Sequence, residues 1–218
     1  MNQEKNEKIY SNIKIFLTGY GPWGDHKSNP TMDVVKALCE EKKKEVETEH
    51  TKLVEYEIYE VKVEYVDEHI RKFYEKFNEM KKEENTLYIV VHYGLYAGTK
   101  MIQIETRGVN YINDNYNHNG LIDKNSTEYL YTKFDTEKIV NYIKEHNVEC
   151  QVSDDAGKFL CNYMLFNSLN LSKDLPKTKA LFIHIPNFED YSLDKNIQFF
   201  KTFIKALEEL FIKKDNLK

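Results

Sequence analysis

Residues 148–169 read VECQVSDDAGKFLCNYMLFNSL and determine the expected fold class. An apolar strand pattern runs from Val148 to Val152 and ends in a short polar turn. A helical pattern then runs from Phe159 to Leu169. A strand that leads through a tight turn into a helix is a building block of layered α/β domains, so we expect such a domain here.

Cys161 lies near the N-terminus of the predicted helix, where unpaired backbone N–H groups and the helix dipole favour a thiolate. Asp154 and Asp155 oppose this effect with negative charge, and we expect Asp155 to cap the helix. Downstream, His184 interrupts the apolar run FIHIP at 182–186. A cysteine and a histidine at the ends of neighbouring α/β units fit a thiol nucleophile and its base. Two structural alternatives stay open, since free cysteines and strand histidines are often core residues.

Strand and helix patterns alternate along the rest of the chain, which again indicates a layered α/β domain. The expected strands cover residues 13–20, 53–63, 87–91, 102–111 and 181–183, and the expected helices cover residues 30–41, 66–80 and 193–211, with another around 139–143. Residues 113–126 carry no clear pattern and are expected to form a long loop. No linker composition is evident, so we expect a single domain over residues 1–218 with a flexible N-terminus at 1–11.

Composition and charge exclude several classes of protein. The 218 residues are 41% hydrophobic and 31% charged, and the formal net charge is -5. These values are ordinary for a globular protein and give no basic surface for nucleic acid. We find no apolar run long enough to cross a bilayer and no apolar secretory segment at the N-terminus. We therefore expect a cytoplasmic protein with no nucleic-acid or membrane partner.

The three cysteines do not form an even disulfide framework and fit a reducing compartment. The chain has no CxxC pair, so no zinc site, other metal site or cofactor is expected.

Four motifs resemble those of the pyroglutamyl peptidase I (pyrrolidone-carboxylate peptidase) family of cysteine peptidases. TGYGPWG at 18–24, followed by Asn29-Pro30, is similar to the family's opening turn and helix start. IETRGVN at 104–110 resembles the segment with its catalytic glutamate, DAGKFLCN at 155–162 its nucleophile motif, and FIHIP at 182–186 its histidine motif. The motifs occur in family order from Ile13 to Pro186, which makes the set more specific than any one of them.

The resemblance implies a three-layer α/β/α sandwich with a mixed, mostly parallel sheet, of the phosphorylase/hydrolase-like kind. It implies an exopeptidase that removes N-terminal pyroglutamate through a thioester. Cys161 would be the nucleophile, His184 the base and then the acid, and Glu105 the carboxylate that orients His184. Peptides with N-terminal pyroglutamate would be the substrates, and a homo-oligomer, either dimer or tetramer, would be the assembly.

A pocket for pyroglutamate must receive a flat, uncharged lactam, so we expect mostly apolar and aromatic walls. By resemblance, Tyr20 and Trp23 cover the ring and Phe159 with Leu160 forms a further wall. Leu95 stands where the family has a glutamine-containing turn, which is tolerable if the backbone makes the lactam contact.

The chain departs from the family where an oxyanion-binding arginine is expected. Residues 113–120 read NDNYNHNG, without arginine or proline, and Asn115 lies nearest the arginine's place. Asn115 or Arg107 is the candidate replacement, although Arg107 is equally suited to pair with a surface carboxylate. This departure leaves a second hypothesis open, namely a weakly active or inactive homologue that binds pyroglutamyl peptides or small lactams.

Two further hypotheses rank lower. A nucleoside-phosphorylase-like enzyme would need a glycine-rich phosphate cradle beside a basic residue, and none is evident. A redox sensor built on Cys161 would need a resolving thiol; none is obvious in the sequence, although Cys150 could approach Cys161 in space.

Overall fold

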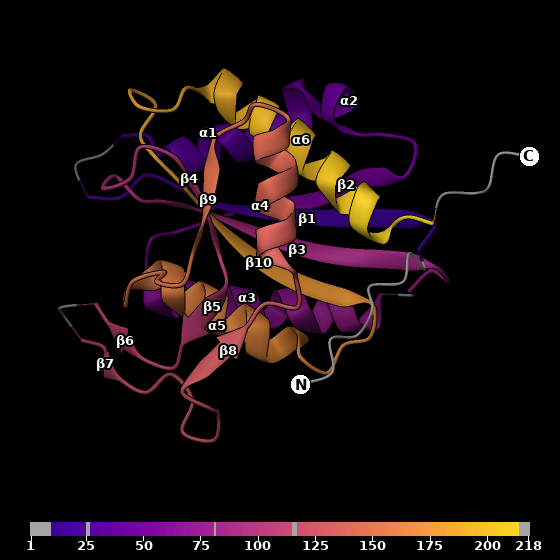
Figure 1. Cartoon of the computed structure of the whole chain (residues 1–218). Coiled ribbons are helices and arrows are strands. Elements are labelled where there is room, and N and C mark those ends of the chain that lie inside the picture. The colour runs from indigo at the N-terminus through magenta and orange to yellow at the C-terminus, as the bar shows by residue number, and fades with distance from the viewer. Residues whose placement is uncertain (1–9, 25–26, 81, 115–116, 214–218) are drawn as a thin grey trace, which may run out of the picture.

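A six-stranded sheet forms the centre of the computed structural model, which describes residues 10–24, 27–80, 82–114 and 117–213. The sheet order is β2-β1-β3-β10-β4-β9 (Figure 1). Its strands are β1 (Asn12–Tyr20), β2 (Thr51–Tyr59), β3 (Thr86–Leu95), β4 (Ile102–Glu105), β9 (Cys150–Ser153) and β10 (Thr178–Ile185). The β10–β4 pairing is antiparallel and the other pairings of this sheet are parallel, so the sheet is mixed and mostly parallel.

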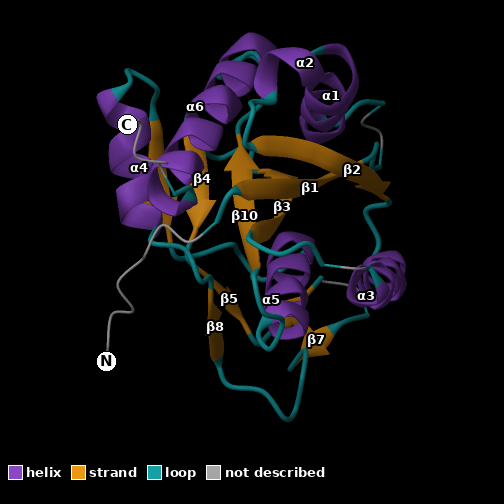
Figure 2. Ribbon diagram, turned by 90° about the vertical axis from the view of Figure 1, so that its right-hand side faces the viewer, coloured by secondary structure: helices purple, strands orange, loops and turns teal. Residues whose placement is uncertain are grey.

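Helices cover both faces of the sheet and complete the three layers (Figure 2). One face carries α1 (Pro30–Lys36), α2 (Lys43–Val46), α4 (Thr136–Glu145) and α6 (Leu193–Phe211), with the π-helical turn η1 (Ala37–Glu41) after α1. The other face carries α3 (Val63–Glu79) and α5 (Leu160–Ser172). Two small pairs lie outside the main sheet, β5 (Arg107–Val109) with β8 (Tyr129–Tyr131) and β6 (Ile112–Asn113) with β7 (Asn119–Gly120). The predicted three-layer α/β/α class is confirmed.

Local sequence explains why α1 starts where it does. The Asn29 side chain accepts a hydrogen bond of 3.1 Å from the Thr31 N–H, and Pro30 occupies the first helical position. Asparagine at the cap and proline at the next position are both favoured there. The expected helix from 30 to 41 is therefore right in its start, although its second half winds as the π-helical turn η1.

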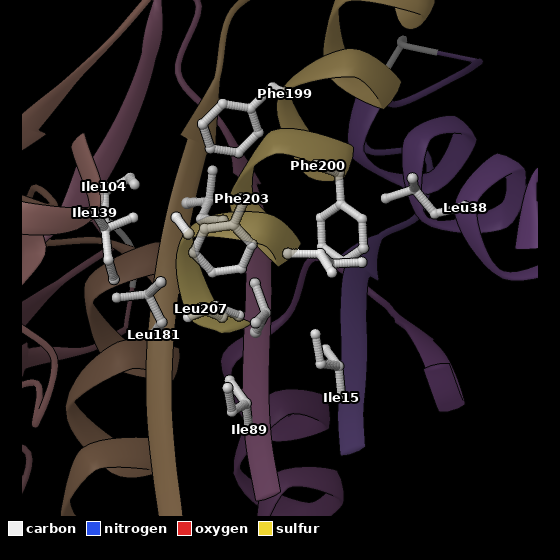
Figure 3. Close-up of a cluster of buried hydrophobic side chains, with 14 of the residues drawn as sticks. Ile15, Leu38, Ile89, Ile104, Ile139, Leu181, Phe199, Phe200, Phe203 and Leu207 are labelled. Carbon is white, nitrogen blue, oxygen red and sulfur yellow. The ribbon is translucent and has the colours of Figure 1, made fainter. Parts of the chain in front are cut away.

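Two hydrophobic clusters hold the layers together, one on each face of the sheet. In the first, Phe199, Phe200 and Phe203 of α6 lie over strand residues such as Ile15, Ile89 and Leu181 (Figure 3). The second joins α3 and α5 to the opposite face of the sheet. Full burial of each large apolar side chain stabilises the fold by about 1.5–3 kcal/mol.

Two predicted strands are too long. The strand expected over 53–63 ends at Tyr59, because Val63, Val66 and Ile70 are buried on one face of α3. The strand expected over 102–111 breaks after Glu105. There the Thr106 N–H bonds to the Ser153 carbonyl and the chain turns out of the main sheet into β5.

The N-terminus and the 113–126 region also depart from expectation. Residues 1–9 lie outside the described residues, but Tyr10 forms a parallel bridge with Ile212 and the Ser11 N–H bonds to the Asn85 carbonyl. The packed part of the chain thus includes the last two residues of the segment expected to be flexible. The region expected to be a loop contains strand β7, which pairs with β6.

No helix in the described ranges is long and apolar enough to cross a membrane.

Candidate active site

Cys161 is the second residue of α5, at the end of the turn that leaves β9. Gly157 has a φ of +78° in this turn, a left-handed conformation that a side chain would strain. Asp155 was expected to cap the helix, and that expectation is wrong. Its Oδ1 accepts from the Gly157 N–H at 3.0 Å, so it stabilises the turn instead. Phe159 holds the cap position with no side-chain hydrogen bond, so the first N–H groups of α5 receive no acceptor from their cap residue.

Strand register brings His184 and Glu105 together. In the antiparallel β10–β4 pair, Phe182 lies opposite Glu105 and His184 lies opposite Gln103. Because side chains alternate along a strand, Glu105 and His184 are diagonal neighbours on one face. His184 Nδ1 lies 2.7 Å from Glu105 Oε1, and both side chains are buried. Phe182 belongs to the cluster on the α5 side, so this face is the one that carries Cys161.

The electrostatics of this group favour a charged imidazole. Burial lowers the pKa of His184, but the charge and hydrogen bond of Cys161, together with those of Glu105, outweigh it and raise the pKa to about 9. Since Glu105 occupies Nδ1, Nε2 is the nitrogen that faces the sulfur. The arrangement is a thiol–imidazole pair supported by a buried carboxylate.

Gly94, which the sequence analysis did not assign to the site, makes room for the nucleophile. It lies opposite His184 in the parallel β3–β10 pair. A Cβ at this position would come within 2.5 Å of the Phe182 ring and 3.0 Å of Cys161 Sγ. The signal was a glycine at the end of an apolar strand, which predicts close approach by another group.

Asn162 is a second residue that the sequence analysis left without a role. It is fully buried and accepts from the Val109 N–H at 2.7 Å, while its amide donates to the Val109 and Tyr111 carbonyls. These bonds join the first turn of α5 to the segment that follows Glu105. Asn162 therefore holds the strand of the carboxylate and the helix of the thiol in register.

A cavity of about 120 Å³ opens beside Cys161. All five residues predicted to contact substrate line it, namely Tyr20, Trp23, Leu95, Phe159 and Leu160. Cys161 also lines it, together with Asn29 and Val61, which were not predicted. Trp23 and Phe159 are 48% and 41% exposed, which is unusual for large apolar side chains. The walls are mostly apolar and suit a neutral ring.

Only one of the two oxyanion candidates can be placed, and it bonds to other groups. Asn115 lies outside the described residues. Arg107 bonds through Nε to the Asp154 carbonyl at 2.8 Å and forms a 3.1 Å ion pair with the Asp154 carboxylate. Its guanidinium also lies 4.5 Å from the centre of the Tyr129 ring. Arg107 thus has the surface-carboxylate pairing that was its alternative role.

The other two thiols are unsuited to chemistry. Burial raises the pKa of both Cys39 and Cys150 to about 12. Cys150 belongs to the hydrophobic cluster on one face of the sheet and Cys161 to the cluster on the other. The hypothesis that Cys150 resolves an oxidised Cys161 is therefore wrong for this fold. Within the described residues no group of three histidine, cysteine or acidic side chains is placed to hold a metal ion.

Together, an α/β/α fold and a half-buried thiol with a buried imidazole–carboxylate pair beside an apolar cavity define a cysteine hydrolase that works by acyl transfer. The family model for pyroglutamyl peptidase matches residues 13–203. The chain belongs to this family and is a cysteine peptidase of the pyroglutamyl-peptidase I type.

Relatives and solved structures agree with the family model. The pyrrolidone-carboxylate peptidase of Pyrococcus furiosus is 28% identical over 193 residues, which cover 84% of this chain and 85% of that protein. That of a Thermoanaerobacter species is 29% identical over 191 residues, with 84% and 87% covered. A mutant pyrrolidone carboxyl peptidase from Pyrococcus furiosus superposes with a TM-score of 0.75 at 25% identity, covering 91% of this chain and all of that one. Bacillus amyloliquefaciens pyroglutamyl peptidase I gives 0.75 at 22% identity, covering 92% and 99%.

Proposed function

We propose that this protein removes N-terminal pyroglutamate from peptides through a thioester on Cys161. The observation that carries the proposal is the placement of the Cys161 thiol between the His184–Glu105 pair and the apolar cavity. Comparisons with known proteins support the activity, and the geometry supports the residue roles.

The reaction follows from the positions of these groups. His184 takes the proton of the Cys161 thiol as the sulfur attacks the carbonyl carbon of the pyroglutamyl residue. His184 then gives this proton to the leaving amine as the C–N bond breaks. A water molecule then attacks the thioester, His184 accepts its proton, and the thiolate leaves with pyroglutamate released. Glu105 holds the imidazole through Nδ1 and stabilises its positive charge.

Backbone N–H groups at the start of α5 are the oxyanion donors in this proposal. Because the cap residue Phe159 makes no side-chain hydrogen bond to this helix, the Cys161 N–H is available to the developing charge. Asn115 remains a candidate second donor. Arg107 would have to give up its contacts with Asp154 to take part.

The cavity explains why the substrate carries a lactam and not a free amine. Tyr20, Trp23 and Phe159 offer ring faces and edges to a flat neutral ring. No aspartate, glutamate, lysine, arginine or histidine side chain is among the lining residues, so a free ammonium group would be desolvated without a carboxylate partner. Asn29 adds polar capacity at the wall, although its side chain already donates to the Gly21 carbonyl at 3.2 Å.

The remaining aspects of the proposal concern the cellular setting. The single main sheet supports a single functional domain over residues 1–218. The three cysteines do not form an even disulfide framework, which supports a cytoplasmic location. Assembly into a dimer or tetramer rests on the family resemblance.

The direct test is hydrolysis of a pyroglutamyl amide that releases a fluorophore. Purified protein should release it, and Cys161→Ala should abolish release while a folded protein remains by circular dichroism. The matched control is Cys39→Ala, a thiol outside the site, which should keep its activity. Turnover that survives Cys161→Ala would remove the nucleophile from this account.

The alternative of a binding protein without turnover gains no support from the comparisons. It would require calorimetric binding of a pyroglutamyl peptide with no cleavage after long incubation. Thiol-dependent release of the fluorophore excludes it.

A further inference from the structure

Tyr96 is an exposed aromatic residue beside the catalytic histidine that the mechanism above does not use. It lies just beyond the end of β3, next to Leu95 of the cavity wall. Its side chain is 48% exposed, yet its ring centre lies 5.8 Å from that of His184 with the planes inclined by 59°. An exposed tyrosine against a buried catalytic base is a surface that substrate can reach.

The Tyr96 ring is held in a fixed place by its own loop. Its N–H donates to the Ile185 carbonyl at 2.9 Å, and its carbonyl accepts from the Thr99 N–H at 3.2 Å. The ring also covers Gly98, where an added Cβ would lie 2.9 Å from a ring carbon. A pre-positioned ring of this kind contacts a ligand with little further loss of conformational freedom.

The chemistry fixes which part of the substrate comes near this ring. His184 must lie within about 2.6–3.2 Å of the leaving nitrogen in order to protonate it. The Cα atom of the first residue of the leaving peptide is one bond, about 1.46 Å, from that nitrogen. That residue is therefore carried past His184, on the side of the scissile bond opposite the lactam pocket.

We infer that Tyr96 forms a wall of the subsite for the first residue of the leaving peptide and favours an apolar or aromatic side chain there. The inference rests on the proposed function. Tyr96 acts on specificity, because its ring offers an apolar surface and an edge-to-face partner at a place that the pyroglutamyl ring does not occupy. One aromatic contact of this kind corresponds to about a twofold to tenfold preference.

The experiment compares two substrates on one enzyme sample. The substrates are the amides of pyroglutamyl-phenylalanine and pyroglutamyl-alanine, and the readout is the ratio of their kcat/KM values. This ratio does not depend on how much of a variant is correctly folded. The wild type should prefer phenylalanine about twofold to tenfold, Tyr96→Ala should bring the ratio close to one, and Tyr96→Phe should keep the preference.

Tyr131→Ala is the matched control, because this tyrosine is 62% exposed and lies on β8, outside the main sheet that carries His184. It should leave the ratio unchanged. The inference is overturned if Tyr96→Ala keeps the wild-type ratio, or if it slows both substrates equally, which would mean that Tyr96 acts on His184. Absence of turnover with either substrate in the wild type would instead overturn the proposed function itself.

Discussion

His92 and His184 are two buried histidines at the same end of the sheet with opposite chemistry. His92 lies on β3 and His184 on the neighbouring β10. The centre of the Phe182 ring lies 6.2 Å from the centre of the His92 ring and 4.9 Å from the centre of the His184 ring. His92 contacts two hydroxyl groups, Thr18 Oγ1 at 2.8 Å and Ser168 Oγ at 2.7 Å.

Their pKa values separate because their partners differ. Burial among neutral groups lowers the pKa of His92 to about 3, so its imidazole is neutral. His184 is nearly as deeply buried, but the charges of Cys161 and Glu105 outweigh burial and raise its pKa to about 9. Burial alone makes a histidine a neutral structural residue, and a charged partner makes it an acid–base group.

The largest expected effect comes from replacing each histidine by glutamine. His184→Gln removes the proton carrier and should lower kcat/KM for a pyroglutamyl amide on the order of 10⁴-fold to 10⁶-fold. His92→Gln should cost stability and leave kcat/KM of the folded protein within about tenfold. The measurement is steady-state kinetics on both variants beside thermal unfolding. Equal losses of activity in the two variants would contradict the distinction between a catalytic His184 and a structural His92.

The second expected effect concerns Glu105, whose carboxylate is one of the groups that raise the pKa of His184. Glu105→Gln keeps the size of the side chain but removes its charge, so the His184 pKa should fall. Catalysis should drop on the order of 10³-fold to 10⁴-fold, as when the third member of a triad is made neutral. Kinetics over pH 5 to 10 would check this, and a wild-type rate and pH profile would exclude the orienting role.

The third expected effect is steric and concerns Gly94, which follows His92 by two residues on β3 and lies opposite His184 of β10. Gly94→Ala places a Cβ against Phe182 and Cys161 Sγ, which should cost about 1–3 kcal/mol of folding free energy. Displacement of the sulfur should also slow hydrolysis by about tenfold or more. Gly24→Ala is the control for replacing a glycine that has open space around it. An added Cβ there meets no atom within 4 Å, although the φ of +56° at this position adds backbone strain. A Gly94→Ala protein with unchanged activity would show that the sulfur has room to spare.

The fourth expected effect is on acid stability and leaves activity at neutral pH unchanged. Between pH 6.5 and about 3, unfolded His92 binds a proton that folded His92 does not bind. The unfolded state therefore gains protons as the pH falls, and stability declines by up to about 1.4 kcal/mol per pH unit from this group. Urea unfolding at several pH values should show a shallower acid decline for His92→Gln than for the wild type. Parallel curves would contradict the buried neutral state of His92.

The sequence predicted the layers of this fold well, because apolar periodicity marks strands and helices directly. It predicted the wrong ends for two strands, because the exit of the chain after Glu105 depends on hydrogen bonds to distant residues such as Ser153. The cap assigned to Asp155 failed for a similar reason. The sequence spacing did not reveal that the Asp155 carboxylate would accept a hydrogen bond from the Gly157 N–H in the turn.

The candidate site likewise combines residues that the sequence predicts with contacts that only the fold reveals. The apolar runs around the two histidines, YIVVHYG and LFIHIP, are alike. The position of His184 after the Cys161 unit suggested it as the base, and the family resemblance strengthened that choice. What distinguishes them is the tertiary placement of Ser168 beside one and Cys161 beside the other. Neither Asn162 nor Tyr96 carries a local signal of its role, because their partners are far away in the sequence.

The most direct test of the Cys161–His184 pair is an NMR titration of the imidazole of His184 in the wild type and in Cys161→Ala. We predict a pKa of about 9 in the wild type and a clearly lower value in the variant, while His92 shows no titration above about pH 4 in either protein. A wild-type His184 that titrates at or below 6.5, or one that Cys161→Ala leaves unchanged, would contradict the account.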